Sequence, residues 1–521
     1  MDPTTPTYDI PPLFLIAEMV SIAPLEASTG TNELDSIYIE SPHPRADVII
    51  VDWDDNDPSN PLNWPVTQKW LITLAACYVC FIVGTNSTAI ASASVQVTER
   101  FSVSDRAFPN DYWLVASWSG GAAFAPLVAL PLMEHYGLRL SFLVYYGLFM
   151  LSIIPQALSR NFATLIVARV FAGGLGGIVQ NSVECVIADT WKDAKAQSLP
   201  ISLFILVFVA SFTAGPIIGA FIASRLYWRW IYYIQLAIYG ASFPLLFVTM
   251  KETRGHVILS RRARQLSKVT GHIYHARGAV TSISPSALLS QAILRPTRLL
   301  CTEAVVFFFT IWSAFALGLV FLSTQSVPQI FSTNYDFSPS QSGYVQGALL
   351  IGEIIGFLAC LAQNAYSQRS ARRNQINPGS PIPEAHLALS IPGSFFGLAG
   401  GLCWYAWTSQ HPSLPWIMPA IGLGLIGFGI VTVVQAVVMY LTDSYVQYAA
   451  SAIAAEAFGE NLVAAFLPLA AKKMYTNIGF QWASMLLGFA ALLLTMAPIV
   501  LTWKGQSIRL KSKFMSQAKR D

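Results

Sequence analysis

Charged residues are scarce in this sequence. Asp, Glu, Lys and Arg make up 11% of the 521 residues, whereas a soluble globular protein carries about 25%. Hydrophobic residues make up 54% of the chain, and so few charges cannot cover that much apolar surface in water. The composition therefore predicts a protein whose solvent is a lipid bilayer. The net charge of +3 is too small to indicate a nucleic-acid partner.

Histidines and cysteines, which often bind metals or react with substrates, are also few. The seven histidines are scattered, and the pair His272 and His275 falls in a polar stretch that makes a poor metal site. All six cysteines lie in apolar stretches, and Cys77 and Cys80, although spaced as C-x-x-C, have no second pair, so we expect buried thiols. No G-x-x-x-x-G-K-[ST] sequence occurs, which argues against an ATP-driven pump. We expect no enzyme, no catalytic residues, no cofactor and no metal.

Twelve stretches are long and apolar enough to cross a bilayer, which takes about 20 residues in a helix. The first six lie near 69–92, 111–132, 140–158, 163–189, 199–224 and 229–250. The second six lie near 298–323, 340–363, 386–407, 416–441, 449–471 and 479–503. The pattern predicts an all-α membrane protein with twelve transmembrane helices in two six-helix halves. We expect no cleavable signal peptide before them, because the first ten residues lack a basic region.

The positions of Lys and Arg predict how the spans are oriented. With the N-terminus in the cytosol, 23 Lys and Arg fall in cytosolic segments and seven in outer segments, as the positive-inside rule requires. The predicted parts are an acidic cytosolic tail (1–68), the first half (69–250), a basic cytosolic linker (251–297), the second half (298–503) and a basic cytosolic tail (504–521). We expect the last of these to lie on an anionic leaflet, and the linker has room for a short interfacial helix.

A stiff, acidic stretch, DNDPSNPLNWP, precedes the first span. Its prolines stop the first helix from extending into the cytosol, and Trp64 and Trp70 are suited to the headgroup level. We expect Asp54, Asp55 and Asp57 to stay in water. The stretch is interpreted as a tether.

The turn after the second span reads LPLMEHYGLRL. Gly137 permits a tight turn there, and Glu134 and Arg139 place charges at the membrane edge, where they can pair with neighbouring helix ends.

Two further motifs lie inside spans. The run LIVARVFAGGLGG places Arg169 within the fourth span, where a charge is costly unless it is buried against polar groups. The run SFTAGPIIGAF places Gly215, Pro216 and Gly219 in the fifth span. Small residues at that spacing let two backbones approach closely, and the proline frees a carbonyl and bends the helix.

These motifs, in this order, resemble those of the major facilitator superfamily, and in particular its twelve-span drug:proton antiporters. The stretches YWRWIYYIQ, YLTDSYVQYAASAIAAEAF, FLPLAAKKMYTNIGFQWASMLLG and IRLKSKF, together with DPSNPLNWP, are similar to the fungal multidrug and metabolite exporters of that group. The resemblance covers residues 57–514. The resemblance implies that the loop motif, with Glu134 and Arg139, gates the inward opening. The sequence departs from the family at Leu130, Met133 and Leu138, which leaves the loop motif with fewer charges, and at Ala220.

The resemblance implies two halves that rock around a midplane site and are driven by groups that bind and release protons. Glu353, in LLIGEIIGFL, lies in the middle of the eighth span; it either carries the coupled proton or bonds a neighbouring helix. Glu456 and Glu460 are one turn apart in the eleventh span, where they either share a proton or Glu456, near the cytosolic end, is simply hydrated. Glu184 is a candidate for a cytosolic gate, and Glu303 for a structural or gating group.

Six residues are candidates for the lining of a substrate cavity, because they lie in spans that line the cavity of this fold. They are Gln180, Asn181, Trp312, Phe315, Gln346 and Gln435. Aromatic and amide groups suit amphipathic organic molecules of moderate size.

The function predicted from the sequence is export of small amphipathic organic molecules by a secondary active transporter, with protons as the counter-ion. A proton-coupled nutrient importer of the same superfamily and a transporter-like membrane sensor are the alternatives. The expected partners are a small organic substrate, protons and the lipid bilayer, with no nucleic acid and with the monomer as the working unit. The expected location is the plasma membrane, with a vesicular or vacuolar membrane as the alternative.

Overall fold

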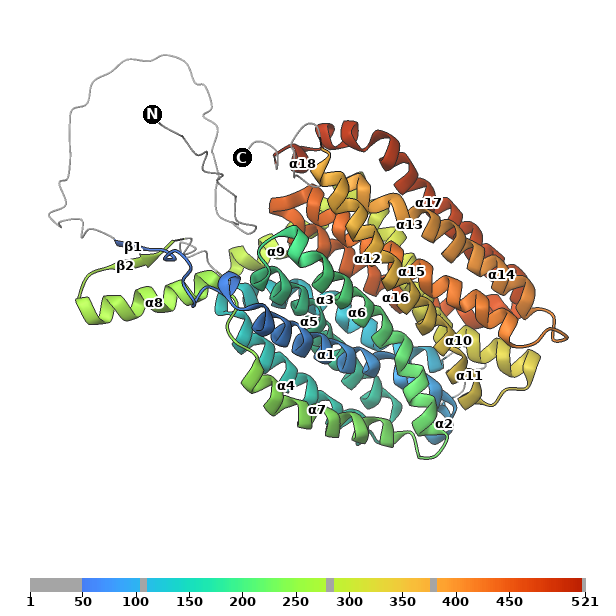
Figure 1. The fold of residues 1–521 in the computed structure, drawn as a ribbon. Coiled ribbons are helices and arrows are strands. Elements are labelled where there is room, and N and C mark those ends of the chain that lie inside the picture. Colours follow the sequence, from blue (N-terminus) through green and yellow to red (C-terminus); the bar gives the residue numbers. More distant parts are fainter. Residues whose placement is uncertain (1–48, 104–109, 278–284, 375–381, 518–521) are drawn as a thin grey trace, which may run out of the picture.

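The computed structural model describes residues 49–103, 110–277, 285–374 and 382–517, and the helices dominate it (Figure 1). Most of the acidic tail, residues 1–48, and the last four residues of the basic tail lie outside this description. The long helices of the first half are α1 (Val66–Ala89), α3 (Trp113–Tyr136), α4 (Leu138–Ala157), α5 (Phe162–Thr190), α6 (Ala194–Ala223) and α7 (Arg229–Thr249). Those of the second half are α10 (Ala304–Tyr335), α12 (Gly347–Arg372), α15 (Ile417–Tyr445), α16 (Ala449–Ile478) and α17 (Phe480–Lys511).

The ninth expected span is composite. It consists of the 3-10 turn η4 (Pro383–His386), α13 (Leu387–Pro392), the π-helical turn η5 (Gly393–Ala399) and α14 (Gly400–Ser409). The shorter elements are η1 (Pro61–Asn63), η2 (Ile90–Ala93), α2 (Ser94–Arg100), η3 (Asn110–Tyr112), α8 (Gly255–Thr270), α9 (Pro285–Thr302), α11 (Pro339–Val345), η6 (Val446–Tyr448) and α18 (Lys513–Gln517).

Eleven helical stretches among the described residues are long and apolar enough to cross a membrane. The longest, Ile417–Ile478, contains both α15 and α16, which η6 joins. Every one of the twelve expected spans therefore coincides with a helix or, for the ninth, with a run of helical turns.

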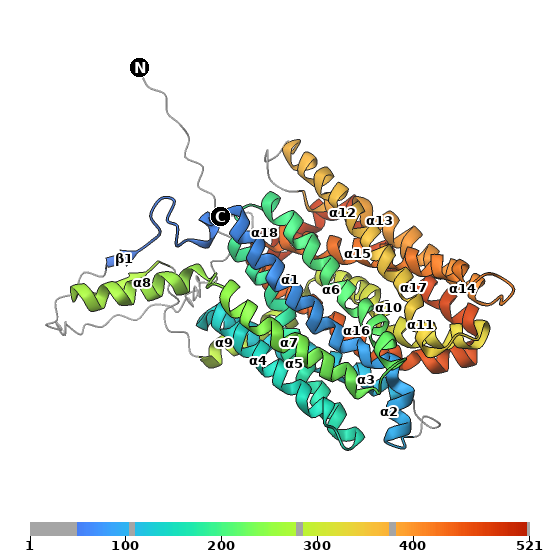
Figure 2. The same cartoon turned by 60° about the horizontal axis from the view of Figure 1, so that its bottom comes forward.

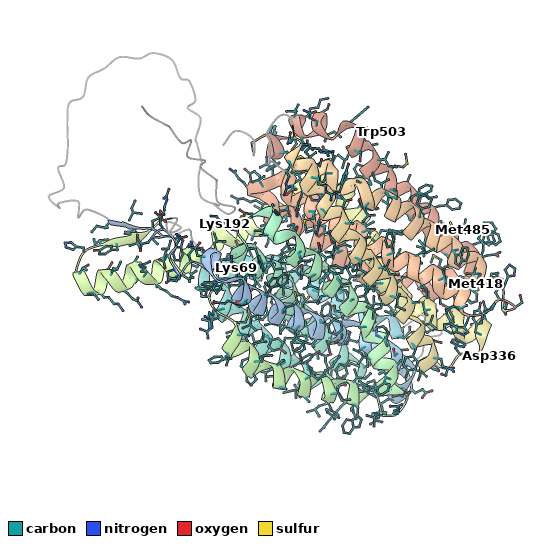
Figure 3. The ribbon with its side chains drawn as sticks, in the orientation of Figure 1. Lys69, Lys192, Asp336, Met418, Met485 and Trp503 are labelled. Carbon is teal, nitrogen blue, oxygen red and sulfur yellow. The ribbon has the colours of Figure 1, made fainter. Side chains whose placement is uncertain are left out.

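The helices form two groups that lie side by side. In the first, α1 packs against α6, and α5 packs against α3 and α4; in the second, α10 packs against α16, and α15 against α12 and α14. Figures 1 and 2 show the two groups in contact along their length, and the contacts between them come mainly from α3 with α16 and from α6 with α12. Lys69 and Lys192 lie at one end of this bundle, and Asp336 and Met418 at the other (Figure 3).

A small subdomain projects from the end of the bundle that carries Lys69 (Figures 1 and 2). Two strands, β1 (Ile49–Val51) and β2 (Tyr274–Ala276), pair in parallel, and the apolar face of α8 covers them through Leu259 and Ala263. Residues 251–297 thus contain a short helix, which packs on the segment preceding α1. That this helix lies at the membrane interface stays a prediction.

One expectation for the acidic stretch was wrong. Asp57 is only 7% exposed, because its carboxylate accepts hydrogen bonds from the Ser59 amide (2.8 Å) and from Arg262 of α8 (2.6 Å). These bonds hold the pKa of Asp57 below its usual value. The prolines act as expected, since α1 begins immediately after Pro65. DNDPSNPLNWP is therefore a strap bound to the linker as well as a tether.

The cysteines are free thiols, and three of the six are buried as expected, while Cys185 and Cys403 are half-buried. Cys77, Cys80 and Cys360 are buried, whereas Cys301 is exposed. Cys301 differs from the expectation because it falls in the last turn of α9, before the seventh span begins at Ala304. Among the described residues, no group of three or more His, Cys, Asp or Glu is arranged to hold a metal ion.

Candidate functional site

Arg169 is completely buried and binds the end of α1. Its Nη2 donates to the Ser87 carbonyl (2.6 Å) and its Nη1 to the Asn86 carbonyl (3.3 Å), where α1 gives way to the 3-10 turn η2. Nη1 also lies 3.4 Å from the hydroxyl of Tyr232 on α7. No carboxylate forms an ion pair with Arg169 in the described part of the chain; its partners there are backbone carbonyls, the Tyr232 hydroxyl and the Gln156 side-chain oxygen, 3.5 Å from Nη1.

The Gly-Pro motif of α6 packs directly on the same end of α1. A Cβ on Gly215 would fall on the Thr88 hydroxyl, and one on Gly219 would fall on the Ala89 carbonyl. The close approach that the small residues predict is therefore present. Pro216 has no amide hydrogen, so the carbonyl one turn before it, Phe212, loses its helical partner. The Thr88 hydroxyl donates to that carbonyl at 2.7 Å.

Glu353 lies on α12, fully buried, at the contact with α6. The hydroxyl of Thr213 on α6 donates to its Oε1 at 2.5 Å, while its Oε2 has no hydrogen-bond partner among the described residues. Glu353 therefore forms a hydrogen bond from the second helix group to the first. The sequence analysis singled out Glu353 but missed Thr213, whose only signal is a hydroxyl two residues before the Gly-Pro step.

A second group of buried carboxyls lies where α16 meets α10. The Ser313 hydroxyl of α10 bonds to Glu456 Oε1 (2.6 Å) and also to Glu460, and both glutamates are 3% exposed. The structure thus brings together two of the predicted acids, Glu456 and Glu460, and adds Ser313. Glu184 is half-buried on α5 in the other helix group, and a site that it shares with these two acids stays a prediction.

The turn motif belongs to an ion-pair cluster at the end of the bundle that carries Lys69. Arg254, just before α8, binds Glu134 (2.9 Å) and Asp189 (3.0 Å). Burial alone would lower the pKa of Arg254, but the charges of Asp189 and Glu134 raise it, so the guanidinium stays charged. The sequence analysis did not single out Arg254. Its guanidinium supplies a positive charge next to the turn motif, which has Leu138 where the family has a basic residue.

Gly137, Leu138 and Arg139 form the rest of the turn motif. Gly137 adopts φ 107°, a conformation that favours glycine, and ends α3. The next amide, that of Leu138, donates to Glu252 Oε1 at 2.9 Å. Arg139 pairs with no carboxylate of the described residues; it donates to the Phe247 carbonyl at 3.2 Å. We expected Arg139 to pair with the end of a neighbouring helix, and it binds α7 through this carbonyl.

Glu303 lies at another helix junction, at the same end of the bundle. It directly precedes α10, and its Oε2 accepts hydrogen bonds from the Tyr445 hydroxyl (3.1 Å) and from Ser512 (2.8 Å), which follows α17. Glu303 therefore ties together three chain segments of the second group, as a structural group does.

The six cavity candidates do not gather at one place. Gln180 donates to the Cys80 carbonyl (3.3 Å), Asn181 to a carbonyl of its own helix, and the Trp312 indole to Ser394 (3.1 Å). Gln346 donates to the Ser323 carbonyl at 3.4 Å. Gln435 donates to Asn364 at 3.1 Å, and Phe315 is 9% exposed. They are mostly packed between helices, and their contact with a substrate stays a prediction.

Comparison with known proteins decides the family. The family model described as Major Facilitator Superfamily matches residues 74–455. The chain belongs to this superfamily. A member of this family is a transporter and not an enzyme, and the two helix groups are its two six-helix halves.

Relatives in the superfamily are fungal. The MFS transporter cpaT of Aspergillus oryzae is 31% identical over 469 residues, covering 89% of this chain and 92% of the relative. The multidrug transporter TPO1_1 of Candida glabrata is 30% identical over 464 residues, covering 88% and 79%. The MFS-type efflux pump MFS2 of Trichophyton rubrum is 30% identical over 487 residues, covering 92% and 80%.

Solved structures agree on the fold. The proton:xylose symporter XylE matches with a TM-score of 0.61 at 16% identity, over 85% of this chain and 96% of that chain. The human organic anion transporter MFSD10 matches with a TM-score of 0.52, also at 16% identity, over 84% and 100%. At this identity the likeness concerns the superfamily fold alone.

Proposed function

We propose that this protein exports small amphipathic organic molecules, such as a drug, a toxin or a secondary metabolite, in exchange for protons. The names of its relatives, which include an efflux pump and a multidrug transporter, support export. The proposed working unit is the monomer, in the plasma membrane or in a vesicular or vacuolar membrane. We further propose that the acidic tail (1–68), the basic linker (251–297) and the basic tail (504–521) lie in the cytosol.

The observation that carries the proton coupling is the bond between Glu353 and Thr213. It lies between two other contacts that α6 makes with the second helix group, one with α11 and one with α12. Toward one end of the pair, Gly343 of α11 packs so closely on Pro216 and Ala220 that no Cβ fits there. Toward the other end, Asn364 donates to the Ser202 hydroxyl at 2.8 Å. When one half moves relative to the other, at either end of the bundle, the contact between α6 and α12 changes.

The burial of Glu353 supplies the link between its proton and that movement. With the interface closed, its Oε2 has no partner among the described residues, so the neutral acid fits there far better than the carboxylate. The carboxylate needs water, which reaches it only when α6 and α12 part. Proton release is thereby tied to the opening of the halves, and proton uptake to their closure. Glu456, Glu460 and Glu184 form the second proposed proton-binding group.

Untargeted mass spectrometry of cells and medium, with the gene deleted and restored, tests export and names the cargo. An exporter leaves its cargo inside the deletion strain and restores it to the medium on complementation. Loss of uptake of a nutrient would instead establish the importer. No cargo in either direction, under conditions in which the gene is expressed, would count against transport of a cellular metabolite.

Proton coupling is tested with the identified cargo in proteoliposomes. Glu353→Gln is expected to abolish transport driven by a pH gradient while leaving cargo exchange without a gradient intact, because the amide cannot carry the proton. The exposed Glu99→Gln serves as the matched control. Full pH-driven transport by Glu353→Gln would show that the proton is carried elsewhere, with Glu456 and Glu460 as the next residues to replace.

A further inference from the structure

His386 and Asp443 form a pair in the second half, at the end of the bundle that carries Lys69. His386 is the last residue of η4, and Asp443 lies in the last turn of α15. The imidazole Nε2 lies 2.8 Å from Asp443 Oδ2, and the two side chains are 10% and 14% exposed. The two side chains form an ion pair only when the imidazole is protonated, and an imidazole ordinarily changes its charge between about pH 5 and 8.

The corresponding aspartate of the first half is paired with an arginine. The two halves of this superfamily are repeats of one another, so the tenth span, α15, corresponds to the fourth span, α5. Asp189 lies in the last turn of α5, as Asp443 does in α15, but it binds the guanidinium of Arg254 at 3.0 Å. A guanidinium stays charged at any physiological pH. One half therefore pairs its aspartate with a permanent charge, and the other half pairs it with a titratable one.

The imidazole is the cation that compensates Asp443. Among the described residues, no lysine or arginine forms an ion pair with this aspartate. The helices that pack against η4 are α12, α13, α15 and α17. Of these, α17 brings Arg509, which binds Glu384 of η4, and the other basic side chains of α12 and α17 are exposed. The remaining ionisable groups near η4 are the thiol of Cys360 and the phenol of Tyr440, neither of which supplies a positive charge.

The pair also holds the end of α12, because η4 binds that helix. His386 Nε2 lies 3.4 Å from Ser367 Oγ on α12. Gln363, one turn earlier on α12, donates to the carbonyl of Ala385, the residue before His386. Through the bond between His386 and Asp443, η4 therefore joins the end of α12 to the end of α15.

The same turns of α12 close on α6 of the first half. Asn364 donates to the Ser202 hydroxyl at 2.8 Å, and Gln368 donates to the Ser198 hydroxyl at 3.2 Å. No charged group takes part in these two bonds, so they are weaker than hydrogen bonds between charged groups. Closure of the two halves at this end therefore depends on how firmly the end of α12 is held.

We propose that His386 and Asp443 form a pH-sensitive latch, which keeps the two halves closed at the end of the bundle that carries Lys69. With the imidazole protonated, the ion pair holds η4 and the end of α12 against α15, and α12 stays against α6. A neutral imidazole still donates to Asp443, but the attraction between opposite charges is lost and α12 separates from α6 more readily. Acid at this end therefore favours closure and alkali favours opening. The latch acts through η4 and requires no proton on Glu353.

The test is the distance between spin labels at the exposed positions 195 on α6 and 372 on α12. It is measured on the full-length protein without its native cysteines, in lipid nanodiscs. Between about pH 5 and 8 the ratio of open to closed molecules should rise by roughly tenfold, the effect of removing the charge from one hydrogen bond. His386→Arg should stay closed over this range, because the guanidinium keeps its charge. His411→Arg, at an exposed histidine, is the control and should open with pH as the unsubstituted protein does.

Two results would overturn the latch. One is a distance that does not change with pH in the unsubstituted protein, and the other is a change of equal size in His386→Arg. Should His386→Arg fail to fold, His386→Gln decides the matter. Its amide is neutral at every pH, so the open fraction should be independent of pH and as high as the unsubstituted protein reaches near pH 8. A distance that still depends on pH in His386→Gln would overturn the latch.

Glu353→Gln separates the latch from proton coupling. If the pH dependence of the distance persists in Glu353→Gln and is absent from His386→Arg, the latch is supported, whether or not Glu353 carries the coupled proton. If the pH dependence disappears in Glu353→Gln and persists in His386→Arg, it belongs to Glu353 and the latch is overturned.

Discussion

Thr88 on α1 supplies the hydrogen bond that Pro216 removes from α6. The proline leaves the Phe212 carbonyl without its helical partner, and the Thr88 hydroxyl occupies that position at 2.7 Å. The two helices are therefore joined at the point where one of them is broken. The Gly-Pro motif works as a contact surface between α1 and α6 and not only as a bend.

Replacing Thr88 by Val should destabilise the protein by about 1–3 kcal/mol, because the Phe212 carbonyl would be left buried without a donor. The measurement is thermal unfolding of the purified protein in detergent. Thr88→Ser, which keeps the hydroxyl, is the control. Equal unfolding temperatures for the Val and Ser variants would show that the hydroxyl does not matter there.

Gly219→Ala should separate α1 from α6, because its Cβ would collide with the Ala89 carbonyl. Overpacking of this kind costs typically about 1–3 kcal/mol, and transport should fall with it. Gly240→Ala on α7 is the matched control, since a Cβ there meets nothing within 4 Å. Thermal unfolding and transport are measured on both variants. Equal unfolding temperatures and equal transport would show that the close contact of α1 and α6 at Gly219 does not matter.

Arg169→Lys should nearly abolish transport although it keeps the positive charge. An ammonium group cannot bind the carbonyls of Asn86 and Ser87 and the Tyr232 hydroxyl in the geometry of the planar guanidinium. Surface expression should remain, which separates this defect from misfolding. Wild-type transport by the Lys variant would mean that charge alone is needed at this site.

Arg254→Met should cost about 3–5 kcal/mol, because it leaves the buried Asp189 without its partner. The neighbouring Arg261→Met is the control: its side chain is 55% exposed and lies 3.7 Å from Glu252, so about 0–1 kcal/mol is expected. Chemical unfolding of both variants compares the two. A similar loss in each would argue that the cluster acts only through its net charge.

Acid should release the strap from α8. The pKa of Asp57 is lowered in the folded protein by the Ser59 amide and by Arg262, so its stabilising effect is present above the ordinary Asp pKa of about 3.9 and is lost as pH falls through the lower folded value. Spin labels at the exposed positions 55 and 264, in a background without the native cysteines, report the distance. The distance should broaden below about pH 4. In Asp57→Asn it should already be broad at neutral pH, and a distribution narrow at every pH would refute the idea.

The sequence by itself determined the spans. Long apolar runs leave a helix as the only way to satisfy the backbone inside a bilayer, so each of the twelve expected stretches coincides with helical structure. The sequence also determined three local features, because each depends on a few neighbouring residues. They are the start of α1 after Pro65, the turn at Gly137 and the carbonyl freed by Pro216.

Only the tertiary structure decided the partners. Thr213 lies 140 residues from Glu353, and Arg254 lies 120 residues from Glu134, so no pattern in the sequence connects them. The same holds for Asp57, which looked solvated because the strap is acidic and polar, but which lies beside Arg262 once α8 folds back on β1. Which buried charge meets which polar group depends on how separate helices pack, and helix-forming tendency carries no information about that.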